Sequence, residues 1–460
     1  MPHHTADQHR YDNPLLDVDI PDPDVTALST GGYALVASSF DRSPGLPLWH
    51  SDDLVSWTRV GSAGGVRADA PHDGGVWAPS IRENAGLLYV TWGDPDLGIL
   101  VVEASDIHGP WSEPRLVLAG RGLIDACPIW NADGTATIVH GFARSRAGFN
   151  NRIDAFPIDG RLTAATGPGS TIINGDSIEG CSVLEGPKIY RRNGEYLILA
   201  PAGGVATGWQ YAFRAPALEG PWEHRIVLQQ GATAVNGPHQ GAWVEGADGE
   251  EWFLHFQDKG WLGRVLHLQP LRWGEDGWPV IGEPGAEGVG EPVSSWPTPG
   301  GSTWAAPAQG ENFTGDSLSP DWHGRPTNPA ELVVAVGHGR LTMAAGTILQ
   351  PIAGTDGSWD VAVLDRRDAS AVLVVADRET HALVLHADGV EIVSGETPPQ
   401  QVRTGTTLGL RRSGDTARFA VDGVEVGEPF QLEGRRWTGS EWGLEVRGGG
   451  TVTFGPVRIR

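Results

Sequence analysis

The chain has 460 residues, more than one ordinary domain of about 100 to 200 residues holds, so at least one domain boundary is expected. Its composition, 40% hydrophobic and 20% charged, is typical of a globular protein. The 57 acidic side chains outnumber the 33 basic ones and give a formal net charge of -24, which repels nucleic acid and anionic membranes and argues against both as partners.

The first residues of the chain are polar. Residues 1–14, MPHHTADQHRYDNP, lack the apolar core of a signal peptide, and no later stretch reaches the roughly 20 apolar residues of a membrane span. A cytoplasmic protein is therefore expected. Cys127 and Cys181 are too few for a disulfide scaffold and lack metal-ligand spacing, so we interpret them as reduced packing thiols, with a single bridge as the alternative.

A fivefold internal repeat occupies residues 11–281. Short alternating apolar runs recur there without a sustained helical stripe, and the 65 glycines and 34 prolines fit an all-β chain rich in turns. Five strands begin after a turn glycine, at intervals of 54, 48, 60 and 55 residues. These glycines are Gly32, Gly86, Gly134, Gly194 and Gly249. Four-stranded units of about 40 to 50 residues are typical of β-propeller blades, so five blades are predicted.

A residue suited to chemistry or to ligand binding stands nine or ten positions before each of these glycines. The five residues are Asp22, Trp77, Asp125, Glu185 and His239. In a propeller the strand before each turn glycine lies nearest the central axis, so their side chains are expected to converge on one funnel. Asp22 and Glu185, distant in the chain, would then face each other across it.

The pattern changes after the fifth repeat. Residues 286–308 are rich in glycine and proline and lack alternation, which predicts a linker between a propeller over residues 11–285 and a second domain over residues 309–460. The second domain consists of short predicted strands joined by turns such as Asp388-Gly389, a pattern that favours a β-sandwich.

One segment of each repeat carries a family motif. The segments are PDPDV at 21–25, GGVWAPSIR at 74–82, GLIDACPIWNADG at 122–134, LEGPKIYRRNGEYLILAPAGG at 184–204 and GPHQGAWVE at 237–245. They resemble glycoside hydrolase family 43, the inverting β-xylosidases and α-L-arabinofuranosidases built on a five-bladed propeller. The segment ENFTGDSLSPDWHGR at 311–325 is similar to the start of the concanavalin-like, jelly-roll sandwich that often follows such propellers.

The resemblance assigns roles to three carboxyl groups. It implies that Asp22 is the general base, that Glu185 is the general acid, and that Asp125 positions the acid and tunes its pKa. The chain departs from the family pattern at Ser80 and Ala126, which follow Pro79 and Asp125. Both departures concern the pocket walls, and hence the sugar accepted, rather than the carboxyl groups.

Inverting hydrolysis explains why two of these groups are needed. One carboxylic acid protonates the departing oxygen while a carboxylate activates water on the opposite face, roughly 6.5 to 9.5 Å away. Glu185 has to hold a proton near neutral pH, which burial or the charge of Asp125 would favour, and Asp22 has to stay ionised by accepting hydrogen bonds. Each acid alone could serve an ordinary turn or loop; their shared position in the repeat favours catalysis.

Six further residues are candidates for substrate binding. Trp77 either stacks on the sugar or fills the gap between blades 1 and 2, and His239 either acts directly or plugs the propeller axis through hydrogen bonds. The resemblance implies that Arg264 reaches sugar hydroxyls, with a surface ion pair as the alternative. Pocket walls are expected near the ends of second strands, at Trp92, Phe142 and Gln257.

No cofactor is required by this chemistry. The resemblance allows a structural calcium ion on the axis near His239, but one imidazole does not make a metal site, so metal content stays open. The implied substrate is a small oligosaccharide derived from hemicellulose, which loses a terminal xylose or L-arabinofuranose. The sequence does not decide between these sugars and does not fix the linkage, the oligomeric state or the role of the sandwich.

Three alternative functions remain. A non-catalytic sugar-binding propeller would tolerate loss of the carboxyl groups, yet all three are present. A fructan-type propeller hydrolase would require a WMNDPN-like opening and an Arg-Asp-Pro motif, and the chain has neither. A phosphorolytic enzyme would need a basic phosphate pocket near the acid, and no clear cluster is present.

Overall fold

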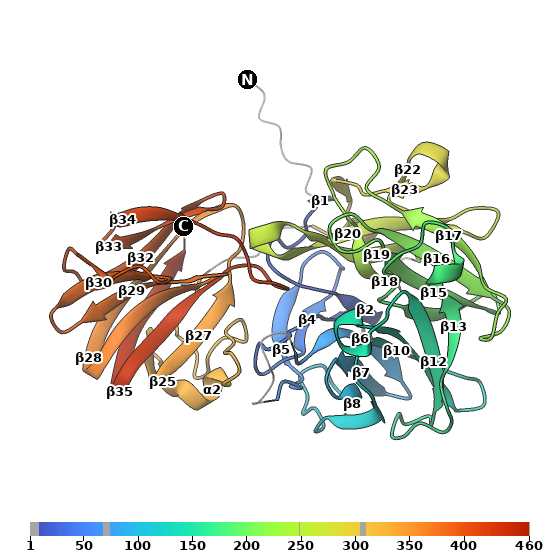
Figure 1. Ribbon diagram of the computed structural model, residues 1–460, viewed down its shortest axis with the longest axis horizontal. Coiled ribbons are helices and arrows are strands. Elements are labelled where there is room, and N and C mark those ends of the chain that lie inside the picture. The colour runs from blue at the N-terminus through green and yellow to red at the C-terminus, as the bar shows by residue number, and fades with distance from the viewer. Residues whose placement is uncertain (1–8, 68–73, 248, 304–309, 460) are drawn as a thin grey trace.

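The computed structural model describes residues 9–459, apart from 68–73, 248 and 304–309. Two lobes lie side by side (Figure 1). The N-terminal part of the chain, coloured blue to yellow, forms one lobe, and the C-terminal part, coloured orange to red, forms the other. Part of the polar N-terminal segment, residues 1–8, and part of the predicted linker, residues 304–308, fall outside the described residues.

The first lobe is a five-bladed β-propeller, as the repeat predicted. Each blade is an antiparallel four-stranded sheet whose strands follow chain order. Blade 1 holds β2 (Asp24–Ala27), β3 (Tyr33–Val36), β4 (Pro47–Ser51) and β5 (Thr58–Ser62); blade 2 holds β6 (Trp77–Asn84), β7 (Leu87–Asp94), β8 (Gly98–Ala104) and β9 (Arg115–Ala119); blade 3 holds β10 (Leu123–Trp130), β11 (Ala136–Phe142), β12 (Arg152–Ile158) and β13 (Ser170–Asn174); blade 4 holds β14 (Lys188–Arg192), β15 (Glu195–Ala202), β16 (Trp209–Ala215) and β17 (Glu223–Leu228); blade 5 holds β18 (His239–Glu245), β19 (Glu251–Asp258), β20 (Arg264–Trp273) and β21 (Pro279–Ile281).

The second strand of each blade is apolar on both faces because a neighbouring blade covers each face. In β7, Leu88, Val90 and Trp92 pack into the core shared with blade 1, whereas Tyr89 packs into the core shared with blade 3. Successive side chains of a strand point to opposite faces of its sheet, so each blade packs against the blade before it through one core and against the blade after it through another. The ring of cores holds the first strands, β2, β6, β10, β14 and β18, around the axis.

The N-terminal segment closes the ring. The Leu15 amide donates to the Leu266 carbonyl at 2.8 Å, and the Tyr11 hydroxyl donates to the Leu268 carbonyl at 2.9 Å, so the segment before blade 1 lies along blade 5. Strand β1 (Arg10–Asp12) also pairs with β24 (Ser295–Pro297). Chain segments about 250 residues apart are therefore fastened together next to Asp22.

Residues 283–297, placed mostly in the predicted linker, are attached to the propeller. Strand β23 (Gly290–Glu291) pairs in parallel with β17 and antiparallel with β22 (Glu283–Pro284), which extends the sheet of blade 4. The predicted boundaries at 285 and 309 remain predictions. The helical elements are one turn long: α1 (Arg144–Ala147), η1 (Gly175–Ser177), η2 (Gly260–Leu262), η3 (Ala286–Gly288), η4 (Pro299–Gly301) and α2 (Pro329–Leu332).

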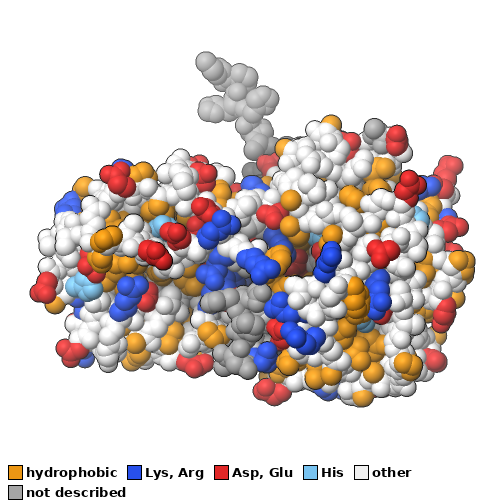
Figure 2. Space-filling view, viewed as in Figure 1, with side chains coloured by type: hydrophobic (Ala, Val, Ile, Leu, Met, Phe, Trp, Pro, Cys, Tyr) orange, Lys and Arg blue, Asp and Glu red, His pale blue; other side chains and the backbone are white. Residues whose placement is uncertain are grey.

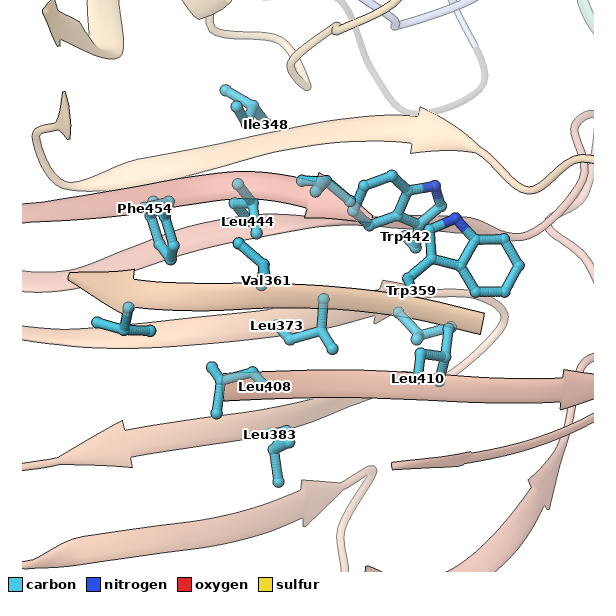
Figure 3. Packing of buried hydrophobic residues seen from close by; sticks show 14 of the residues in the cluster. Ile348, Trp359, Val361, Leu373, Leu383, Leu408, Leu410, Trp442, Leu444 and Phe454 are labelled. Atoms are coloured by element: carbon cyan, nitrogen blue, oxygen red, sulfur yellow. The ribbon is translucent and has the colours of Figure 1, made fainter. Parts of the chain in front are cut away.

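The second lobe is the predicted β-sandwich. Its strands are β25 (Val333–Gly337), β26 (Arg340–Met343), β27 (Gly346–Pro351), β28 (Asp356–Ala376), β29 (Thr380–His386), β30 (Gly389–Ser394), β31 (Gln400–Val402), β32 (Thr407–Ser413), β33 (Thr416–Val421), β34 (Val424–Gln431) and β35 (Glu441–Ile459). The two long strands β28 and β35 pair with each other along most of their length, and three register shifts interrupt this pairing. Such irregularities bend strands, which allows each of the two to take part in both sheets of the sandwich. Trp359, Trp442 and Phe454 lie among the aliphatic side chains of the core between them (Figure 3).

The two lobes contact each other directly. Ser43 and Gly324 exchange a pair of backbone hydrogen bonds, both 3.0 Å long, and Val18 forms a bridge with Ala353. Lys and Arg side chains gather on the face of the seam seen in Figure 2. Both cysteines are free thiols, and none of the described helices has the length and apolarity to span a membrane.

Candidate active site

Asp22 enters blade 1 between two prolines. Its backbone has a left-handed φ of 52°, which aspartate tolerates better than most residues, and its side chain is buried. One carboxyl oxygen accepts from Arg264 Nη1 at 2.7 Å, and the other accepts from Ser38 Oγ at 2.6 Å. These are the hydrogen bonds expected for an ionised carboxylate, which can only accept.

Asp125 lies on the innermost strand of blade 3, where the ladder is irregular. The pairing of β10 with β11 shifts between Ile124 and Cys127, and Asp125 has a φ of 63°. Such a bulge changes the direction of one side chain within a strand. The Asp125 carboxylate accepts from the Gly186 amide at 2.7 Å, which connects blade 3 to the residue after Glu185.

Glu185 precedes blade 4 and contacts blade 5. Its Oε1 lies 3.0 Å from His239 Nε2, and His239 is fully buried with Nδ1 unpaired. Gly141 separates Glu185 from Asp125: a Cβ at this glycine would lie 3.3 Å from Asp125 Oδ2 and 3.5 Å from Glu185 Cα. The close packing of these backbones brings the two carboxyl groups together.

The same irregularity recurs on other blades. The pairing of β6 with β7 shifts after Trp77, where Ala78 has a φ of 35°, and the pairing of β18 with β19 shifts after His239, where Gln240 has a φ of 27°. Non-glycine residues rarely adopt such values, and they cluster at functional sites. In blades 2, 3 and 5 the repeat position identified in the sequence thus coincides with a break in the register of the first strand.

Electrostatic interactions connect the three carboxyl groups. Burial, and then the charge of Glu185, raise the pKa of Asp125 to about 8, with a smaller contribution from Asp22. Buried Lys188 opposes this rise and donates to the Pro79 carbonyl and to Ser80 Oγ, both at 2.8 Å. The sequence predicts a proton on Glu185, whereas burial beside Glu185 favours a proton on Asp125.

Trp77 lies beside Asp22 and meets an aromatic residue from the second domain. Ser38 Oγ, which donates to Asp22, accepts from the Ala78 amide at 2.7 Å. The Trp77 ring lies 5.9 Å from Phe40 and 5.6 Å from Trp437, which belongs to the loop between β34 and β35. The half-buried indole therefore lies at the domain junction, between Phe40 of blade 1 and Trp437 of the sandwich, and stacking on a sugar stays a prediction.

The structure excludes the alternative for Arg264 and corrects the prediction for Trp92. Arg264 is not in a surface ion pair; it is buried against Phe256, with 4.8 Å between guanidinium carbon and ring centre, and is bound to Asp22. Sugar binding by Arg264 stays a prediction. Trp92 is fully buried in the core between blades 1 and 2, because alternation turns it away from the funnel.

Phe142 and Gln257 lie near second-strand ends as expected, and both support nearby segments. Phe142 packs 4.7 Å from Phe149 under the guanidinium of Arg152, and Gln257 donates to the Ala234 carbonyl and to Asn236. Sugar contacts by either residue remain a prediction.

Sequence reasoning missed Ser38, Lys188 and Trp437. Lys188 carried a signal, because it is one of two lysines in the chain and follows the Glu185-Gly186-Pro187 motif directly. Ser38 and Trp437 carried none, since their roles depend on tertiary contacts. Among the described residues no three His, Cys, Asp or Glu side chains are grouped to hold a metal ion, so the calcium near His239 has no support beyond its unpaired Nδ1.

Comparison with known proteins places this propeller in a family. The model of glycosyl hydrolases family 43 matches residues 11–279, more than half of the chain. The chain belongs to glycosyl hydrolase family 43. It is therefore a glycoside hydrolase, and the expected family resemblance is confirmed.

Relatives of this family 43 chain include several pentosidases. It is 35% identical over 462 residues to a putative beta-xylosidase of Xylanibacter ruminicola, covering 94% of this chain and 85% of the relative. It is 27% identical to the non-reducing end alpha-L-arabinofuranosidase BoGH43B of Bacteroides ovatus, over 68% of this chain and 61% of that one. The structure of a xylan beta-1,4-xylosidase of Bacillus halodurans shares the two-domain fold, with a TM-score of 0.83 at 20% identity over 98% of this chain and 99% of that one.

Proposed function

We propose that this family 43 enzyme is an exo-acting, inverting hydrolase that removes terminal xylose or L-arabinofuranose from hemicellulose-derived oligosaccharides. The observation that carries the proposal is the junction of three blades: Asp125 is bound to the backbone beside Glu185, and its pKa responds to both Glu185 and Asp22. The names of the relatives support a pentose, and the relative at 35% identity favours xylose.

The reaction uses two of the three carboxyl groups, one as an acid and one as a base. Glu185 donates its proton to the glycosidic oxygen, so the leaving group departs as a neutral alcohol. Asp22, held by Arg264 and Ser38, takes a proton from a water molecule whose oxygen attacks the anomeric carbon from the opposite face. The new C–O bond replaces the broken one with inverted configuration. Proton exchange with solvent then restores both groups.

Asp125 and His239 act on the acid. Asp125 interacts electrostatically with Glu185 and anchors the Gly186 amide beside it, and His239 Nε2 fixes the orientation of the Glu185 carboxyl group. Trp77 and Trp437 supply apolar ring faces on which a pentose can stack. No metal or organic cofactor enters this scheme.

A panel of nitrophenyl pentosides tests the proposal. The wild type should hydrolyse β-D-xylosides or α-L-arabinofuranosides, and Asp22→Asn should lose turnover even of these activated substrates, by about 10³-fold or more, because no acid can replace the missing base. Circular dichroism should show an unchanged fold. Hydrolysis of neither pentoside, or normal rates in the folded Asp22→Asn variant, would contradict the proposed function.

A further inference from the structure

A chain of buried charged residues crosses the domain interface and ends at Asp22. It begins at Glu441, the fully buried first residue of β35 in the sandwich. Glu441 Oε1 accepts from Arg42 Nε at 2.6 Å, and Arg42 Nη2 donates to Asp19 Oδ2 at 2.6 Å. Asp19 and Arg42 belong to the propeller and are also buried, so solvent screens these charges little.

The second oxygen of Asp19 fixes the backbone of Arg264. Asp19 Oδ1 accepts from the Arg264 amide at 2.8 Å, and the Arg264 carbonyl accepts from the Ile20 amide at 2.8 Å. The side chain of the same arginine donates to Asp22 Oδ1 at 2.7 Å. The position of this donor therefore depends on Asp19, and Asp19 is oriented by Arg42.

The loop that contains Arg42 also carries the other donor to Asp22. Arg42 lies between β3 and β4, and its amide donates to the Ser39 carbonyl at 2.9 Å. Ser38, adjacent in this loop, donates to Asp22 Oδ2 at 2.6 Å. The guanidinium group of Arg42 thus anchors the loop that carries Ser38 and, through Asp19, the backbone of Arg264.

The sandwich holds Glu441 rigidly. His323 Nε2 lies 2.8 Å from Oε1, and Arg325 donates from Nε to Oε2 at 2.9 Å and from Nη2 to Oε1 at 3.0 Å. Arg325 also pairs with Asp41, the neighbour of Arg42. Burial alone would raise the pKa of Glu441, but Arg325 and Arg42 hold it well below the usual value, so the residue is ionised at assay pH.

We propose that Glu441 of the sandwich is a positioning residue for the catalytic base, acting through Arg42 on the two groups that orient Asp22. The inference rests on the proposed function, in which Asp22 is that base. The second domain then completes the catalytic centre of the propeller instead of only adhering to it.

A positioning role and a purely adhesive role predict different kinetics. A misoriented base slows attack by water whatever the leaving group, so kcat should fall equally for activated and unactivated pentosides while KM changes little. Loss of adhesion alone should lower the thermal midpoint and leave kcat unchanged in the folded protein.

The test uses Glu441→Gln in the full chain, with Glu445→Gln as the matched control. Glu445 lies on the same strand and pairs with Arg447, a contact about 20 to 40% exposed. We expect Glu441→Gln to lower kcat about 10- to 100-fold on nitrophenyl xyloside and on xylobiose alike, with KM within about threefold, and Glu445→Gln to match the wild type. A kcat within twofold of the wild type, or a loss confined to KM, would overturn the inference.

Two further variants keep the outcome interpretable. If Glu441→Gln fails to fold, Arg42→Lys, which retains the charge but cannot bridge Glu441 and Asp19, carries the same kinetic expectation, and normal turnover there would overturn the inference. Asp22→Asn, assayed in parallel, separates the two hypotheses: a folded, active Asp22→Asn refutes the proposed function itself, whereas an inactive Asp22→Asn beside a normal Glu441→Gln refutes only the positioning role.

Discussion

At the residue scale, the candidate site depends on carboxyl groups that the backbone brings near enough to interact electrostatically. Asp22 and Asp125 both have left-handed φ values, and each is buried where only specific donors reach it. Such strain persists only where the surrounding fold over-determines it. An arginine and a hydroxyl group donate to Asp22, whereas Asp125 has one amide donor and lies near Glu185, which with burial raises the pKa of Asp125.

The raised pKa of Asp125 predicts how stability depends on pH. A carboxyl group with a folded pKa near 8 and an ordinary value near 3.8 when unfolded stabilises the fold fully at low pH, and this contribution is lost as pH rises between the two values. Asp125→Asn carries no ionisable group there and still offers an oxygen to the Gly186 amide. Its thermal midpoint should therefore exceed that of the wild type by about 2 °C or more at pH 9 and approach it at pH 4.

Activity should change in the opposite direction in this variant. The Asp125 carboxyl group interacts electrostatically with Glu185, the proposed general acid. Replacing it by an amide should therefore move the alkaline limb of kcat/KM to lower pH and lower kcat about tenfold or more. Calorimetry and pH-rate profiles of both proteins provide the measurement. A wild-type midpoint equal to that of the variant at pH 9 would contradict the buried, proton-holding role of Asp125.

The role of Glu185 predicts a dependence on the leaving group. Glu185→Gln should lower kcat about 10³-fold on xylobiose and less than about tenfold on a dinitrophenyl xyloside, because protonation matters most when departure is difficult. Glu179→Gln, an exposed residue of the same loop, is the matched control. Equal losses on both substrates would argue against Glu185 as the general acid.

At the scale of elements, the first strands are held in place by a buried carboxylate that does no chemistry. Asp24 at the start of β2 accepts from the Ile81 amide at 2.7 Å and from Arg82 Nη1 at 2.6 Å, and Lys188 lies 3.9 Å away. It therefore connects blades 1, 2 and 4 around the axis. Arg82 depends on it: although burial opposes the charge, Asp24 keeps the pKa of Arg82 above its ordinary value.

Removing this carboxylate should destabilise the ring. Asp24→Ala leaves a buried arginine and an amide without their acceptor, and we expect a loss of about 3 to 5 kcal/mol in the free energy of unfolding. Asp52→Ala, whose side chain is 94% exposed, should change it by less than about 0.5 kcal/mol. Denaturant unfolding gives both values; similar stabilities of the two variants would show that the contact between blades is not required.

The sequence predicted the elements well because a propeller repeat is local. Strand alternation, a turn glycine and the residue nine or ten positions before it all lie within one blade, and they led to Asp22, Asp125 and Glu185. Trp92 shows the limit: nearness to the end of a second strand does not tell which face of the blade a side chain covers. Arg264 was found only through the family motif, and its buried partner Asp22 could not be foreseen from position.

At the scale of the whole molecule, both domains contribute side chains beside the candidate site. Trp437 lies more than 350 residues from Trp77 in the chain, and no periodicity relates the two, so this contact could not be predicted. Glu441 follows four residues later and connects the same junction to Arg42. The sandwich thus contributes both aromatic and charged contacts beside the site.

The aromatic contact should affect binding more than turnover. Trp437→Ala removes a ring face beside Trp77, and we expect KM for xylobiose to rise about fivefold or more with kcat changed less than threefold. Trp437→Phe keeps an aromatic face and should recover most of the affinity. Steady-state kinetics of the three proteins test this, and an unchanged KM in the alanine variant would place Trp437 outside the substrate pocket.

The stereochemistry of the first turnover tests the central claim most directly. If Asp22 activates water while Glu185 protonates the leaving group, proton NMR during early hydrolysis of a β-xyloside should show α-xylose before mutarotation mixes the anomers. Initial release of β-xylose would mean that one carboxyl group attacks the sugar itself, which would contradict the role of Asp22 as a general base.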